Sequence, residues 1–282
     1  MFPIQGSSPS IRQALRPFHA WQFHAFPFTM TSSSLPDFSL HRWSAWAPAM
    51  ADADGWLAWA RGETSLAAHE ETAAVRMMPP LLRRRARPLG RAALEVLYTP
   101  TLACADQPIV FCSRHGEMSR ALALLQALAA EGQVSPQEFS MSVHNAIPGL
   151  FLIAKQSRAP VISLASENRL ALSGMTEALA LLADGAPSVT LLFCDEPLPT
   201  LFYPFIDSEP TCFAFALEMT AGKDYRLAYG DTSPSPEPAS APITGSALPL
   251  LRFVLDETQN AMPLTETADW QLLRLAPEGG HA

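Results

Sequence analysis

Short runs of apolar residues recur along the chain, and most of them have the length and the polar boundaries of β-strands. "PIVFCS" is one example, lying between a polar segment and a Ser-Arg-His turn. Runs of this kind are typical of strands that are buried in a sheet. The pattern predicts strands near residues 38–46, 108–113, 160–165, 188–194 and 211–218, with a last short strand at 268–277.

Between these runs the apolar residues take up helical spacing. Segment 117–132 is predicted to be a helix that ends at Gly132, a typical C-cap. Its apolar stripe consists of Met118, Leu122, Leu125 and Ala129. Segment 167–185 is predicted to be a second long helix, ended by Gly185. Further helices are expected at 89–98 and 248–257.

Another helix is predicted to begin after Ser135. The run Ser135-Pro136-Gln137-Glu138 has the form of a capping box with proline at the first helical position. We expect this helix to contain His144 and to reach the break at Pro148-Gly149.

The alternation of strands and helices with short connections predicts an α/β fold, with one mixed β-sheet layered with helices. The ordered domain is expected to span residues 35–275, with a Pro/Ser-rich loop at 231–246 and a tail at 276–282. Residues 1–34 are expected to be a flexible or misannotated extension, because Met30 would serve as a start as well as Met1 does.

Composition excludes several classes of protein. The 19 basic and 27 acidic residues give a net charge of −8, which disfavours a nucleic-acid-binding surface. The 4 cysteines form no C-x-x-C pair, so neither a metal site nor a disulfide framework is expected. No apolar run is long enough to span a membrane, and the N-terminus lacks a signal-peptide core. We expect a cytoplasmic protein without a cofactor.

The motif "SRHGE" at 113–117 lies where a strand ends and a helix begins, the usual place for ligand contacts in α/β sheets. Arg114 and His115 could bind an anion, and Glu117 could act as a base. Alternatively, Ser113 and Glu117 satisfy the helix N-terminus while Arg114 and His115 pair locally, which we favour.

Ser166 is the candidate nucleophile in the next such turn, "LASENR" at 164–169. His144 could serve as its base in a Ser-His pair. The alternative, which we favour, is that Ser166 and its neighbours form an ordinary helix cap and that His144 is structural.

Five arginines form a basic cluster in this acidic chain: Arg83, Arg84, Arg85, Arg87 and Arg91. They could form a docking patch for an acidic partner or simply a solvated helix face. Our working prediction is that the cluster contributes to binding and not to the fold.

Taken in order, the motifs of the middle of the chain are similar to the N-terminal half of a β-ketoacyl-acyl carrier protein synthase. The segment Asn145 to Gly149 matches the one that precedes the nucleophile strand in ketosynthases, and Leu164-Ala165-Ser166 matches the nucleophile turn. The chain more closely resembles the short β-ketoacyl synthase chain length factors. It shares with them "SRHGE", "FSMSVHNA", "LLADG" and "DEPLP", over roughly residues 35–275.

The resemblance implies a thiolase-like half-fold, but two departures imply that the chain is not an enzyme. Ser166 stands where ketosynthases have cysteine, and a hydroxyl does not ionise near neutral pH as a thiol can. The two catalytic histidines of ketosynthases come from a C-terminal half, whereas only His281 follows residue 199 here.

The implied function is that of a non-catalytic chain length factor. It would pair with an active ketosynthase as a heterodimer and shape its acyl tunnel in fatty acid or aryl polyene-like polyketide synthesis. Interface or tunnel candidates are Arg114, His115, Glu117, His144, Asn145 and Ser166, and the arginine cluster is the candidate site for acyl carrier protein. The alternatives are a serine hydrolase or acyltransferase that uses Ser166 with His144 or His115, and a scaffold that recruits the carrier protein.

Overall fold

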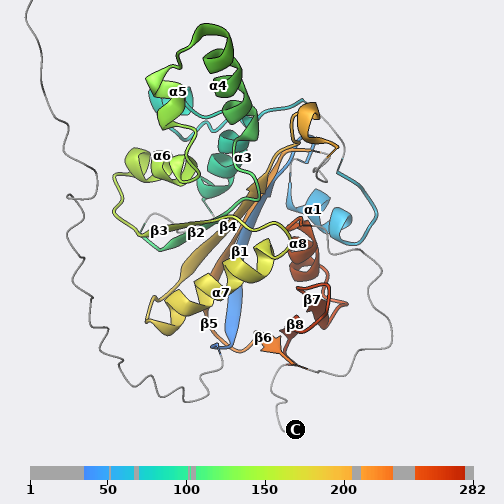
Figure 1. Cartoon of the computed structure of the whole chain (residues 1–282). Helices are drawn as coiled ribbons and strands as arrows, with labels where there is room; N and C mark the ends of the chain where they lie inside the picture. The colour runs from blue at the N-terminus through green and yellow to red at the C-terminus, as the bar shows by residue number, and fades with distance from the viewer. Residues whose placement is uncertain are drawn as a thin grey trace, which may run out of the picture. The chain divides into compact units, whose positions relative to one another are not determined.

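The structure is a computed structural model that describes residues 35–50, 52–66, 70–100, 102, 106–204, 211–230 and 245–276. In this part of the chain eight strands form one mixed sheet with the order β3-β2-β4-β5-β1-β6-β8-β7 (Figure 1). The strands are β1 (Phe38–Trp46), β2 (Ile109–Cys112), β3 (Val161–Leu164), β4 (Val189–Asp195), β5 (Phe213–Ala221), β6 (Tyr225–Tyr229), β7 (Ala261–Pro263) and β8 (Trp270–Arg274).

Strands β3, β2 and β4 run parallel to one another, and β5 joins β4 in the antiparallel direction. Strands β2 and β4 are fully buried along their length, as expected for parallel strands that are covered on both faces. Their side chains alternate between the two faces of the sheet. Val110 and Phe193 belong to one hydrophobic cluster, whereas Phe111 and Leu192 belong to the other.

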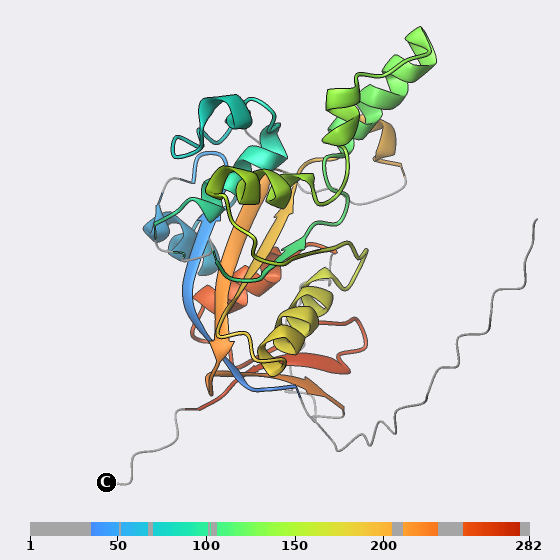
Figure 2. The same cartoon turned by 90° about the vertical axis from the view of Figure 1, so that its left-hand side faces the viewer.

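Helices cover both faces of this sheet (Figures 1 and 2). They are α1 (Ala53–Ala60), α2 (Pro80–Arg83), α3 (Pro88–Leu97), α4 (Met118–Glu131), α5 (Pro136–Ser140), α6 (Ala146–Lys155), α7 (Leu170–Ala183) and α8 (Leu248–Leu255), with a 3₁₀ turn at Thr200–Phe202. Buried residues of α1, α7 and α8 join one cluster, and those of α3 and α6 join the other. The mixed α/β sheet predicted from the sequence is confirmed.

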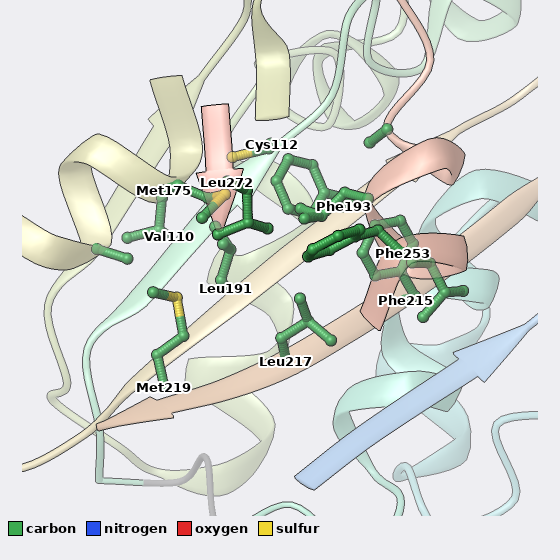
Figure 3. Packing of buried hydrophobic residues seen from close by; sticks show 14 of the residues in the cluster. Val110, Cys112, Met175, Leu191, Phe193, Phe215, Leu217, Met219, Phe253 and Leu272 are labelled. Carbon is green, nitrogen blue, oxygen red and sulfur yellow. The ribbon is translucent and has the colours of Figure 1, made fainter. Parts of the chain in front are cut away.

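Helix α7 packs directly on the parallel strands because Gly174 removes a side chain at the contact. A Cβ atom at Gly174 would lie 2.7 Å from Sγ of Cys112 and 3.1 Å from the ring of Phe193. Phe193 itself stacks on Phe215 with 5.0 Å between ring centroids (Figure 3). The close approach of helix and sheet leaves this cluster densely filled.

Helix α4 ends as predicted, but its apolar stripe is not buried. Gly132 has the left-handed conformation, with φ of 71°, and its amide donates to the carbonyl of Leu128. Arg120 is the buried residue of the helix, while Leu125 and Leu128 are 61% and 49% exposed. None of the apolar residues of the predicted stripe is buried, because periodicity predicts the helix but not whether another element covers it.

The helix predicted to begin after Ser135 does start there, and the Ser135 side chain accepts from the Glu138 amide. It ends at Ser140, however, so the prediction that His144 is helical is wrong. His144 lies in a turn before α6, and Pro148 stands within the first turn of that helix. Proline is tolerated there because a first-turn amide needs no partner within the helix.

Other predictions met mixed outcomes. The five strands near 38–46, 108–113, 160–165, 188–194 and 211–218 all exist, whereas α1, β6 and β7 had not been predicted. Residues 1–34 and most of the expected loop and tail lie outside the described residues. In the part of the chain that is described, no helix is long and apolar enough to cross a bilayer.

Candidate functional site

The candidate site is built at the carboxyl ends of the three parallel strands, where Asp195 organises the turn after β2. Asp195 is buried, with 2% of its surface exposed. One oxygen of its carboxylate accepts hydrogen bonds from the Ser113 hydroxyl and from the Arg114 amide, both at 2.9 Å. The Ser113 oxygen in turn accepts from the amide of Gly116 at 2.9 Å. These bonds join "SRHGE" to "DEPLP", because β2 and β4 are neighbours in the sheet.

His144 ties the end of β3 to the same turn. Its Nε2 atom lies 2.9 Å from the carbonyl oxygen of Leu164 and must donate, because a carbonyl only accepts. The ring packs edge-on against Phe111, with centroids 5.3 Å apart. Gly116, with φ of 61°, allows this approach, since a Cβ atom there would be 3.1 Å from Nδ1 of His144. The geometry is that of a structural histidine.

Ser166 lies two residues beyond β3 and is half-buried. Within the described residues, no hydrogen bond links its hydroxyl to His144 or to His115. Helix α7 begins only at Leu170, and its N-cap Arg169 makes no side-chain cap bond. Our interpretation of Ser166 as a helix cap is therefore wrong, because the turn is longer than the sequence pattern indicated.

Arg114 and His115 lie beside the turn that carries Ser166. Burial lowers the pKa of His115, and the charge of Arg114 lowers it further, against the attraction of Glu167. His115 Nε2 and Arg114 Nε are buried without a hydrogen-bond partner among the described residues. Gly245 packs here as well, because a Cβ atom at that position would collide with the guanidinium of Arg114 and the carbonyl of Glu167. Three separate segments therefore meet at this point.

The three described cysteines do not substitute for a missing nucleophile. Cys112, Cys194 and Cys212 are free and buried. Burial, followed by the nearby carboxylate of Asp195, raises the pKa of the Cys112 thiol, and burial also raises the pKa of the other two thiols. A protonated, inaccessible thiol is inert toward an acyl thioester. Cys104 lies outside the described residues.

Glu117 is engaged in an ion pair rather than poised as a base. Its carboxylate accepts from Nε of Arg120 at 3.1 Å, and both side chains are buried. Burial raises the pKa of Glu117, and the charge of Arg120 opposes the rise. Arg120 was not among the predicted site residues, although a cation three residues after Glu117 in an apolar helix indicates an ion pair. Asn145 is exposed at the N-cap of α6 and makes no side-chain cap bond.

The arginine cluster divides into two groups. Arg83 donates to the carbonyl of Val75, Arg91 to that of Ala86, and Arg87 pairs with Glu138 at 2.8 Å. The side chains of Arg84 and Arg85 are exposed. The prediction that the cluster takes no part in the fold is therefore wrong for Arg83, Arg87 and Arg91, because their donors satisfy oxygens of the same chain. Carrier-protein docking stays a prediction.

Comparison with known proteins places this geometry in a family. The model of the β-ketoacyl synthase N-terminal domain matches residues 56–271. No curated protein matches the chain.

Solved structures show the same fold. A chain from the complex of a ketosynthase (ApeO) with its chain length factor (ApeC) from Xenorhabdus doucetiae is 24% identical, with a TM-score of 0.71, and the match covers 84% of this chain and 99% of that one. The ishigamide ketosynthase/chain length factor is 14% identical, with a TM-score of 0.54 and coverage of 68% and 67%. A type II polyketide ketosynthase in complex with its acyl carrier protein (AntDE:AntF) is 12% identical, with a TM-score of 0.52 and coverage of 66% and 63%.

The thiolase-like fold that the sequence resemblance implied is confirmed by these structures. The family model spans most of the chain, including strands β2 to β7, the Asp195 turn and the segment that carries Ser166. The chain belongs to the family of β-ketoacyl synthase N-terminal domains.

Proposed function

We propose that this protein is a non-catalytic subunit, a chain length factor, that pairs with an active β-ketoacyl synthase and helps shape its acyl tunnel. The observation that carries the proposal is the state of the nucleophile turn. Ser166 occupies the position of the ketosynthase cysteine, while the nearby His144 uses its Nε2 proton on the Leu164 carbonyl. A serine without a base is a poor nucleophile, yet the turn keeps its shape.

The solved neighbours support a paired role. Two of them are described as complexes or assemblies of a ketosynthase with a chain length factor, and a third includes an acyl carrier protein. By analogy, we propose that the present chain pairs with a ketosynthase to which an acyl carrier protein binds. The exposed Arg84 and Arg85 remain the candidates for contact with an acidic carrier protein.

The surface of the chain also supports a protein partner. Ten large hydrophobic side chains are exposed among the described residues, and five of them lie in the segment that runs from the start of α4 to the end of α6. They are Leu125, Leu128, Phe139, Val143 and Ile153. The same segment leads into β3, the edge strand of the sheet, which has a neighbour on one side only. Large exposed apolar side chains that gather in one segment of the chain support a protein partner for that segment.

The decisive experiment is co-expression with a ketosynthase encoded beside this gene, together with its acyl carrier protein. Product formation is expected to persist with Ser166→Ala and to stop when the nucleophilic cysteine of the ketosynthase is replaced by alanine. Chain-length distribution of the products is measured by mass spectrometry with and without this subunit.

Three outcomes would contradict the proposal. One is an acyl adduct trapped on Ser166 in the intact protein, which would show covalent chemistry. Another is hydrolysis of an acyl thioester by this chain alone that disappears in Ser166→Ala, which would support the serine hydrolase instead. A Ser166→Ala protein that binds the ketosynthase but yields no product would also overturn it.

A further inference from the structure

Helices α4 and α5 form a hairpin (residues 118–140) that stands away from the strands in both views of the fold (Figures 1 and 2). Arg120 is the buried residue of α4, at 1% exposure, and α5 contributes no buried residue. The contacts of Arg120 therefore carry unusual weight in deciding how the hairpin is oriented.

Arg120 lies at the centre of a group of charged side chains that we call the Arg120 cluster: Arg87, Glu117, Arg120 and Glu138. Its guanidinium donates to both oxygens of Glu117, at 3.1 and 3.4 Å, and to Glu138 at 2.6 Å. It also donates to the backbone carbonyl of Arg85 at 2.9 Å. Arg87 pairs with the same oxygen of Glu138 at 2.8 Å. Two positive and two negative side chains therefore neutralise one another.

The cluster joins three parts of the chain. Glu138 belongs to α5, at the far side of the hairpin, and Arg85 belongs to the segment between α2 and α3. The Glu117 carboxylate also lies beside the first turn of α3, where a Cβ atom at Gly90 would be 3.6 Å from Oε1 of Glu117, so it faces the positive end of that helix. Helix α3 is itself buried against the sheet. The cluster thus fastens the hairpin to the body of the protein.

A second contact supports the base of the hairpin. The amide of Ser119, in the first turn of α4, donates to Glu196 at 3.3 Å. Beyond this base the helix has no charged residue from Ala121 to Ala130, and its exposed leucines have no cover. Apolar contacts are not directional, whereas charge-assisted hydrogen bonds fix both distance and angle. The orientation of α4 therefore depends on the charged base.

We propose that Arg120 is a positioning residue that holds the α4–α5 hairpin in the orientation in which its exposed Leu125 and Leu128 meet the ketosynthase partner. Arg120 is too deeply buried to touch a partner, so its effect on pairing acts through Leu125 and Leu128. The part that concerns pairing rests on the proposed function, whereas the part that concerns the orientation of the hairpin is a property of this chain alone.

The first test uses the isolated full-length protein. Arg120→Met keeps much of the side-chain volume and removes every donor, and Arg61→Met is the control, since Arg61 forms an exposed pair with Glu63. Hydrogen exchange of peptides from residues 118–140 is expected to accelerate by at least about tenfold in Arg120→Met, with peptides from β2 and β4 nearly unchanged. Arg120→Lys, which keeps the charge, is expected to restore part of the protection.

A second variant keeps the test decisive if Arg120→Met fails to fold. Glu138→Gln removes the charge from the arm of the cluster that lies on α5, where the side chain is 35% exposed. Faster exchange confined to the hairpin supports the proposal. Unchanged protection of the hairpin in Glu138→Gln, or acceleration spread equally over β2 and β4, overturns it.

The second test measures affinity for the ketosynthase by titration calorimetry. Arg120→Met is expected to weaken binding to the ketosynthase by about tenfold or more. Leu125→Ala is expected to reduce the affinity less in the Arg120→Met background than in the wild type, because a loosened hairpin no longer presents its leucines to the partner. Additive effects of the two substitutions, or unchanged affinity with a loosened hairpin, would contradict the positioning role. Failure of the wild type to bind would instead contradict the proposed function and leave the hydrogen-exchange result standing.

Discussion

Helices α4 and α7 are both 14 residues long and rich in leucine and alanine, yet α7 is largely buried and α4 is largely exposed. Helix α7 buries seven residues against the parallel strands: Leu170, Leu172, Gly174, Met175, Ala178, Leu179 and Leu182. Helix α4 buries Arg120 and leaves Leu125 and Leu128 exposed. The difference shows that the role of an apolar helix depends on whether another element of the chain packs against it. One helix stabilises the sheet, and the other is available to a partner.

The largest expected effect comes from the same substitution made in each helix. Leu179→Ala is expected to lower the free energy of unfolding by about 2–5 kcal/mol, because Leu179 is fully buried and its loss leaves a cavity. Leu125→Ala is expected to change it by no more than about 0.5 kcal/mol. Urea unfolding of the two variants measures the contrast. Equal losses would mean that α4 is covered in solution by another copy of this chain.

The next effect is on association. The double variant Leu125→Glu with Leu128→Glu is expected to weaken ketosynthase binding by about 2 kcal/mol or more, because it places charges in an apolar contact. Its unfolding free energy is expected to stay near that of wild type. Tyr229→Glu is a matched control, since Tyr229 is 69% exposed and lies on β6, outside the α4–α6 segment. If both variants bind alike, the hairpin is not the contact surface.

A smaller loss is expected from the turn that joins β2 to β4. Asp195→Ala would leave the Ser113 hydroxyl and the Arg114 amide without their acceptor, at a cost of about 1–3 kcal/mol of stability. The exposed Glu131, at the end of α4, provides the comparison, and Glu131→Ala is expected to have no measurable effect. Thermal and urea unfolding decide the matter. A stable Asp195→Ala protein would show that water replaces the carboxylate.

The smallest expected effect is a pH dependence at Glu117. Burial raises its pKa above the ordinary value of 4.5, so the folded protein binds this proton more tightly than the unfolded chain does. Its contribution to stability is therefore present at low pH and is lost as pH rises through the raised pKa. Relative to Glu117→Gln, wild type is expected to gain stability between pH 7 and pH 5 in urea unfolding. A loss of stability of wild type relative to Glu117→Gln between pH 7 and pH 5 would mean that the attraction of Arg120 outweighs the effect of burial on the pKa of Glu117.

Much of the local structure could be predicted from the sequence. The apolar runs that became β2 and β4 are readable because parallel strands are buried on both faces, and Gly132 marks the end of α4 because only glycine adopts that backbone conformation freely. The resemblance to the ketosynthase family rested on several motifs, among them residues 113–117 and 164–166, which come together at neighbouring strand ends. The absence of catalysis and the roles of the site residues stay predictions.

Local pattern by itself determined where many of the helices and strands form, since that depends on spacing and on caps within a few residues, but it did not predict α1, β6 or β7. The tertiary structure alone decided which apolar helix is covered, because the stripe of α4 and the face of α7 look alike along the chain. It also decided which polar groups meet: Ser113 finds Asp195 across 82 residues of sequence, and His144 finds a carbonyl on β3. Such pairings arise from the order of strands in the sheet, which no short-range pattern of residues encodes.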